Sequence, residues 1–206
     1  MKILSYIFAV VGLLALSYWA IVFVSAQRYQ YRETQRFTSG QKAEPGTPSL
    51  SESPTNEKRS YPSTGSPVAL LEIPRLRLSA VVVEGADEHE LKLGPGHIRG
   101  TSLPGEGGNV GVAGHRDTFF RPLRLIRRDD TIKVIAYERE YQYKVVSLQI
   151  VEPEDIQVLY PTARETLTLV TCYPFDFVGS APKRFIVRAD CVECPRPLPI
   201  AAGSLR

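Results

Sequence analysis

Hydrophobic and polar positions divide the 206-residue chain into three parts with different patterns. Residues 3–26 carry no charged side chain and are almost continuously apolar, whereas residues 27–67 are mostly polar. From Val68 onward, short apolar or alternating runs return, separated by glycine, proline and charged residues. Runs of this length that are rich in β-branched and aromatic residues are typical of half-buried strands. The pattern therefore predicts an apolar N-terminal segment, a polar linker and a β-rich domain over residues 68–194.

Seven to eight short strands are expected in this domain. The clearest runs are residues 68–73, 78–83, 109–113, 131–136, 141–151, 165–172 and 183–192. Residues 86–93 and 119–126 are amphipathic and predict short helical segments. Many short strands with turn signals and few helices indicate an all-β barrel or sandwich of roughly 125 residues.

The first apolar run predicts a transmembrane anchor over residues 1–26, since roughly 20 apolar residues span a bilayer as a helix. A cleaved secretory signal is the alternative, because Val24-Ser25-Ala26 resembles a cleavage site. The run is longer than the ~7–15 apolar residues of a typical signal, which favours an uncleaved anchor. Lys2 before the run and three arginines after it do not by themselves favour export of the domain.

Residues 27–67 contain five prolines and little apolar content, which is typical of a flexible tether. An autoinhibitory lid with Tyr61 as its plug is the alternative. The Pro-rich tail, residues 195–206, is expected to be disordered.

Charge and composition exclude several classes of function. The formal net charge is +3, from 25 basic and 22 acidic residues, and no basic stripe with interleaved aromatics indicates nucleic-acid binding. The glycine-rich stretch 94–114 matches neither a phosphate loop nor a dinucleotide fingerprint, so no cofactor is expected. Asp87, Glu88 and Glu90 form one short acidic run. Such a run is more typical of a solvated helix face than of a metal site, so no metal is expected.

The three cysteines differ in context. Cys191 and Cys194 would need two further ligands to hold zinc, and none follows them, which leaves a disulfide or two thiols. Cys172 ends the strand 165–172, just before Pro174, which cannot donate to a sheet ladder. A buried and inert thiol is the usual state of a free cysteine. The alternative is a nucleophile exposed where a strand gives way to a loop.

Two other residues at strand ends complete a possible catalytic set. A cysteine nucleophile needs a group that moves protons, and His115 follows the strand 109–113. Attack on an amide also builds an oxyanion, which the guanidinium of Arg184 at the start of the last strand is suited to stabilise. His89 and His97 are assigned instead to an exposed helix face and to a loop turn.

These residues carry a resemblance to a known family. The run Thr168-Leu169-Val170-Thr171-Cys172 is similar to the sortase signature T-L-x-T-C, and Gly114-His115 resembles the family's strand-end histidine. Arg184 resembles the arginine that opens the last sortase strand, and the order His, Cys, Arg is the same. The resemblance covers residues 68–192. The runs G-V-A-G-H-R-D-T-F-F and T-C-Y-P-F look most like class D sortases.

The resemblance implies an eight-stranded sortase β-barrel on the outer side of the plasma (inner) membrane. It implies that Cys172 attacks the Thr–Gly bond of an LPxTG-like sorting signal to form a thioester. His115 would protonate the leaving amine and deprotonate the incoming one, and Arg184 would bind the oxyanion, while Thr171 would help to bind the substrate backbone. The implied partners are proteins that bear sorting signals and an amine acceptor, either a cell-wall precursor or a protein amine. A membrane-anchored cysteine protease and a non-catalytic surface β-domain are the alternatives.

Overall fold

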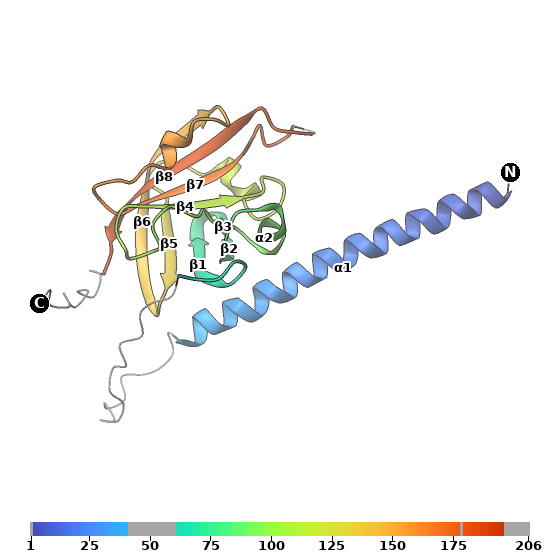
Figure 1. The fold of residues 1–206 in the computed structure, drawn as a ribbon, viewed down its shortest axis with the longest axis horizontal. Helices are drawn as coiled ribbons and strands as arrows, with labels where there is room; N and C mark the ends of the chain where they lie inside the picture. The colour runs from blue at the N-terminus through green and yellow to red at the C-terminus, as the bar shows by residue number, and fades with distance from the viewer. Residues whose placement is uncertain (1, 41–60, 178, 196–206) are drawn as a thin grey trace, which may run out of the picture.

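The computed structural model describes residues 2–40, 61–177 and 179–195. Within the described residues, the β-rich domain is a closed barrel of eight strands in the order β1-β2-β3-β4-β7-β8-β6-β5 (Figure 1). The strands are β1 (Pro67–Ile73), β2 (Leu78–Glu84), β3 (Gly96–His97), β4 (Asn109–Gly114), β5 (Thr131–Ala136), β6 (Arg139–Val151), β7 (Thr166–Tyr173) and β8 (Lys183–Glu193). The helical elements are α1 (Lys2–Gly40), α2 (Glu88–Leu93) and the 3-10 turns η1 (Pro74–Leu76), η2 (Arg121–Leu125) and η3 (Ile156–Leu159). The all-β prediction is confirmed, and of its two alternatives the barrel is the one found.

Alternation along the strands builds the core. Most neighbouring strands are antiparallel, while β2 with β3 and β4 with β7 are parallel. Leu71, Ile132, Tyr143, Leu167 and Val187 point inward and are fully buried. Burying a side chain of this size stabilises a fold by about 1.5–3 kcal/mol, so these inward rows fix the register of each strand.

The two-residue strand β3 is absent from the sequence prediction because so short an element has no hydrophobic period. His97, predicted to serve a loop turn, lies in β3 and is 1% exposed. Its Nδ1 lies 2.8 Å from the buried Glu84 carboxylate on β2, and its Nε2 lies 3.0 Å from the Ser102 carbonyl. The prediction for His97 is therefore corrected to a buried polar link between neighbouring strands.

Residues 119–126 form only one 3-10 turn, η2, where a helical segment is predicted. Pro122 stands at its start and lacks the N–H that a longer helix would use. The prediction for 86–93 is closer, since α2 covers Glu88–Leu93.

Helix α1 does not end where the tether is predicted to begin. It continues through Gln27 to Gly40 without interruption. Residues 27–40 contain no proline and are rich in the helix formers Gln, Arg and Glu, and Glu33 pairs with Arg36 at 3.0 Å. The five prolines of the predicted tether all follow residue 44. The tether prediction is therefore corrected for residues 27–40; its residues 41–60 lie outside the described residues, as do residues 196–206 of the predicted tail.

The second half of α1 packs on the outside of the barrel, and its first half projects away from it (Figure 1). Because β3 pairs only with Val83 and Glu84, no described strand pairs with β2 at Val81 on the side away from β1. The Gln30 side chain takes that place: its Oε1 accepts from the Val81 N–H (2.6 Å) and its Nε2 donates to the Val81 carbonyl (3.1 Å). Phe37 covers a buried outer cluster of Leu70, Val81 and Ile135.

The predicted transmembrane anchor, residues 1–26, coincides with about the first two thirds of α1. Met1 and many side chains of this run lie outside the described residues. Over the part of the chain that the structure describes, no helix combines the length and the apolar character needed to cross a membrane.

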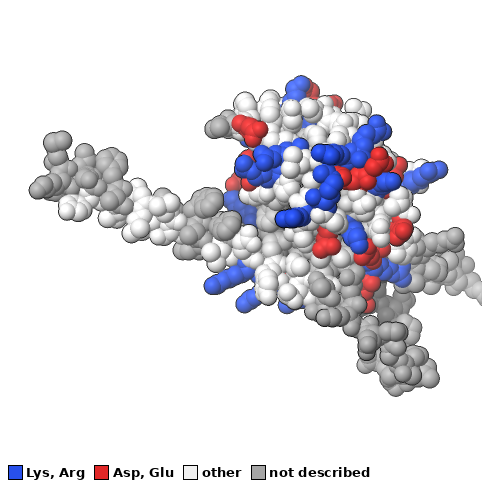
Figure 2. All heavy atoms as spheres, turned by 180° about the vertical axis from the view of Figure 1, so that it is seen from behind, with Lys and Arg blue, Asp and Glu red and all other residues white. Residues whose placement is uncertain are grey.

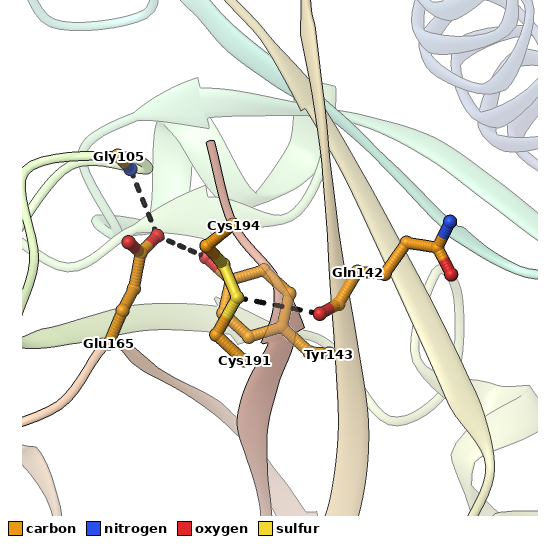
Figure 3. Close-up of a disulfide and its surroundings, with 6 residues drawn as sticks. All are labelled: Gly105, Gln142, Tyr143, Glu165, Cys191 and Cys194. Atoms are coloured by element: carbon orange, nitrogen blue, oxygen red, sulfur yellow. Dashed lines mark hydrogen bonds between the residues drawn. A yellow bond between two sulfur atoms is a disulfide. The ribbon is translucent and has the colours of Figure 1, made fainter. Parts of the chain in front are cut away.

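A disulfide joins Cys191 to Cys194 at the end of β8, which decides between the two alternatives left by the sequence (Figure 3). Beside it, the buried Tyr143 hydroxyl donates to Glu165 at 2.7 Å, and the same carboxylate oxygen accepts from the Gly105 N–H at 3.0 Å. Burial raises the pKa of Tyr143, and the Glu165 charge raises it further. Cys172 is left as the free cysteine of the chain.

Candidate active site

The register of three adjacent strands brings His115, Cys172 and Arg184 to one end of the barrel wall. Strands β4 and β7 run parallel with Gly114 opposite Thr171, so His115 lies level with Cys172. Strands β7 and β8 run antiparallel with Cys172 directly opposite Arg184. The histidine, the thiol and the guanidinium therefore come from neighbouring positions on three neighbouring strands. The structure brings together the three residues predicted from the sequence.

The side chains of Cys172 and Arg184 share a face of the sheet. Directly opposite residues of a ladder point to the same side of the sheet, and successive residues point to opposite sides. Leu169 and Val187 point into the core, so Cys172 and Arg184 point outward. All three residues are half-buried. A nucleophile in this position is ordered by its strand and still open to a substrate that lies along the outer face of the barrel.

The backbone around His115 is fixed by a tight turn. The His115 carbonyl accepts hydrogen bonds from the N–H groups of Thr118 (3.4 Å) and Phe120 (3.1 Å). The Phe120 ring packs under Gly114 so closely that a Cβ there would lie 2.6 Å from a ring carbon. Only glycine fits at this position, and the fully buried ring locks the peptide that carries the histidine.

Arg184 has donors available for a substrate. One guanidinium nitrogen, Nη1, donates to the carbonyls of Ala181 (3.3 Å) and Lys183 (3.1 Å). Within the described residues the structure shows no other hydrogen bond from this guanidinium. Since arginine carries five N–H donors in a rigid plane, the group can bind a carbonyl or an oxyanion while it is still held by its own loop.

Thr171 does not lie on the face of the thiol. It is buried, and its hydroxyl donates to the Gly114 carbonyl at 2.7 Å. The predicted contact with substrate stays a prediction; in the structure, strand alternation turns this side chain inward, where it joins β7 to the residue that precedes His115. This hydrogen bond to the Gly114 carbonyl gives a structural reason for a threonine directly before the cysteine in the T-L-x-T-C signature.

On the outer face of β4, Gly111 leaves room for side chains of the segments that pack over the strand. Gly111 lies on the outward side of β4, and Leu159 from the loop between β6 and β7 packs against it, 3.1 Å from where a Cβ would stand. Asn109 holds that loop, since its Nδ2 donates to the carbonyls of Val158 (3.1 Å) and Tyr160 (3.2 Å). The hydroxyl of Thr168 donates to the other side of the same amide at 2.7 Å.

Basic and acidic side chains are interspersed over the visible face of the barrel, in keeping with the small net charge (Figure 2). In α2, an ion pair with Lys92 at 2.9 Å lowers the pKa of Glu88, and the charge of His115 adds a weaker effect of the same sign. Glu88 is exposed whereas Glu90 is buried, so the acidic run does not converge. Among the described residues no group of three or more His, Cys, Asp or Glu side chains is placed to hold a metal ion.

Two residues that shape this site are missing from the sequence prediction. Asn109 holds the loop between β6 and β7, and Arg116 holds the loop between β7 and β8 through three carbonyls. Their partners are backbone carbonyls far away in sequence, which leave no signature of residue type. The position of Arg116 directly after His115 is the one available signal.

Comparisons with known proteins agree with this geometry. A sortase domain family model matches residues 71–192. Sortase D of Bacillus subtilis (strain 168) is 35% identical over 143 residues, which cover 69% of this chain and 72% of that protein. The structure of a Clostridium perfringens Sortase D5 transpeptidase superposes with a TM-score of 0.59 at 29% identity, over 65% of this chain and 83% of that one.

Clostridium perfringens sortase C, solved with the C-terminal cell wall sorting motif, is similar with a TM-score of 0.58 at 26% identity, over 64% of this chain and 73% of that one. The family model covers more than half of the chain, and the curated relative is matched over more than two thirds of its length. The chain therefore belongs to the sortase family of cysteine transpeptidases.

Proposed function

We propose that this sortase cleaves an LPxTG-like sorting signal between Thr and Gly and transfers the acyl group to an amine. The observation that carries the proposal is the register that places Cys172 opposite Arg184 and level with His115 at one end of the barrel wall. The similarity to a sortase solved with a cell wall sorting motif supports a peptide signal of that kind.

In the first half-reaction the Cys172 thiolate attacks the threonine carbonyl carbon and forms a C–S bond. The carbonyl oxygen becomes an oxyanion that the available Arg184 donors stabilise. When the C–N bond breaks, the His115 imidazolium gives its proton to the leaving glycine amine. The products are a thioester on Cys172 and a peptide that begins with glycine.

In the second half-reaction an acceptor amine attacks the thioester carbonyl and loses a proton to His115. The C–S bond breaks, an amide bond forms, and the thiolate and imidazolium are restored. The acceptor belongs to a cell-wall precursor or to another protein. If water attacked the thioester instead of the amine, the acyl group would be hydrolysed. A cysteine protease would differ from a transpeptidase in this second step.

Product analysis tests the proposal directly. The full chain in mild detergent is incubated with a fluorescent LPxTG-containing peptide, with and without triglycine, and products are identified by mass spectrometry. We expect an amide-linked product only when triglycine is present. Cys172→Ala should give no product. His115→Ala and Arg184→Ala should lower turnover by about 10²–10⁴-fold and about 10²–10³-fold.

Two control variants match these substitutions. His89→Ala removes an exposed histidine, and Arg124→Ala removes an exposed arginine from η2. Both should keep near wild-type turnover. Full turnover by Cys172→Ala would reject the mechanism, and cleavage without any amide-linked product at saturating triglycine would favour a protease.

Membrane attachment is a further part of the proposal. We propose a single-pass anchor in the plasma (inner) membrane over residues 1–26, with the barrel on the extracytoplasmic side. Its support is the charge-free apolar sequence of residues 3–26. Carbonate extraction should leave the chain in the membrane fraction, and protease added to intact cells should degrade the barrel. A mature chain that begins near residue 27 would show a cleaved signal instead.

A further inference from the structure

Arg116 is a buried cation next to the active-site histidine that has no part in the proposed chemistry. It directly follows His115 and is only 7% exposed. Its guanidinium donates to three backbone carbonyls of the loop between β7 and β8: Pro174 (2.9 Å), Phe177 (2.6 Å) and Gly179 (2.9 Å). This loop begins two residues after the nucleophile Cys172.

The chemistry of arginine fits this arrangement. A buried charge is costly unless its donors are satisfied, and the planar guanidinium offers several N–H groups in fixed directions. Its Nε lies 3.6 Å from the exposed Asp117 carboxylate, and its carbon lies 5.9 Å from the centre of the Phe177 ring. Lysine, with a single charged nitrogen on a flexible stem, cannot reproduce three converging bonds in this geometry.

The loop depends on arginine side chains for its hydrogen bonds. Among the described residues between Pro174 and Pro182, no backbone-to-backbone hydrogen bond outside the strands holds the loop in place. Its carbonyls are bound instead by Arg116 and, at Ala181, by Arg184. Three of these four carbonyls are bound by one side chain of the histidine segment, which therefore holds most of the loop that joins Cys172 to Arg184.

We propose that Arg116 is a positioning residue of the active site, which fixes the relative placement of the histidine segment and the loop that follows the nucleophile. It acts through His115, Cys172 and Arg184 and does not itself contact the substrate. The inference rests on the proposed transpeptidase function. A misplacement of about 1 Å can cost about 100-fold in rate, so the effect should fall mainly on kcat.

The test uses the full chain in detergent with the LPxTG-containing peptide and triglycine. Arg116→Ala should lower kcat by about 10–100-fold and change KM by less than about threefold. Arg116→Lys should recover only part of the rate, and added guanidinium chloride at non-denaturing concentration should raise the rate of Arg116→Ala. Arg124→Ala, which removes an exposed arginine of η2, is the matched control and should retain the wild-type kcat.

A second measurement does not depend on turnover. Hydrogen–deuterium exchange should become at least about tenfold faster at the amides of residues 175–177 and 179 in Arg116→Ala, while the strands β5 and β6 remain protected. Unchanged exchange in the loop would overturn the proposal, as would faster exchange with an unchanged kcat. If the wild-type chain shows no turnover while Arg116→Ala still shows faster exchange in the loop, the proposed function is rejected. The contact between Arg116 and the loop is then established on its own.

Discussion

The contact between α1 and the barrel gives a sharp test of the corrected N-terminal boundary. Gln30→Ala removes three hydrogen bonds at once: two to Val81, at 2.6 Å and 3.1 Å, and one from Nε2 to the Leu93 carbonyl at 2.8 Å. Each polar group of the amide is used in these bonds. If residues 27–40 were only a tether, the substitution would have little effect on the stability of the barrel.

The size of the effect follows from these bonds. Three hydrogen bonds contribute about 1 kcal/mol each, and a buried Val81 N–H without a partner would add about 1–3 kcal/mol. Undocking of the helix would let water reach Val81, which limits the loss. We therefore expect a decrease of about 2–4 kcal/mol in the free energy of unfolding. At about 4 °C for each kcal/mol, Tm should fall by about 8–16 °C.

Thermal unfolding followed by circular dichroism measures this change, and hydrogen exchange at the Val81 amide shows whether the edge of β2 has opened. Gln27→Ala is the matched control, because Gln27 is exposed on the same helix. Gly94→Ala should also displace the helix, since its Cβ would lie 2.5 Å from both Gln30 Nε2 and the Val81 carbonyl oxygen. A Tm within about 2 °C of wild type for Gln30→Ala, with Val81 still protected, would refute the reasoning.

Three further predictions concern the barrel. Arg75, at 2.5 Å, and the Arg127 N–H lower the pKa of Asp130. The stability that this carboxylate contributes should be complete above about pH 4 and should decline as the pH falls through the lowered pKa. In chemical unfolding, the free energy of unfolding of Asp130→Asn should therefore lie below that of wild type at neutral pH and approach it in acid. Reduction of the disulfide should leave turnover unchanged, because its first cysteine lies about 23 Å along β8 from Arg184; lost turnover would contradict this separation. Thr171→Val should lower kcat with little change in KM, as expected for an inward side chain that holds the histidine strand; a raised KM alone would instead indicate substrate contact.

The parts of the fold that depend on periodic burial could be predicted from the sequence. Strand β5 covers the predicted residues 131–136, and β7 lies within one residue of the predicted 165–172. The placement of His115, Cys172 and Arg184 at strand ends follows from the same pattern. Their juxtaposition in space does not, because it depends on the pairing of β4 with β7 across the long connection between them.

Other features leave no local pattern. The short β3 has no period, and the buried pair of His97 with Glu84 joins residues that look like loop and strand end. Residues 27–40 are polar on average, and this average does not indicate that one face of the helix packs on the barrel through Gln30 and Phe37. Arg116 binds carbonyls about 60 residues away, and no side chain at those positions records the contact.

Intact-mass spectrometry of the acyl-enzyme tests the central claim most directly. The full chain is mixed with an LPxTG-containing peptide without an added amine and quenched in acid within seconds. The account predicts a mass increase equal to the acyl fragment, located on Cys172 by peptide mapping, released by hydroxylamine and absent from Cys172→Ala. An adduct on another residue, or the same adduct in Cys172→Ala, would contradict it.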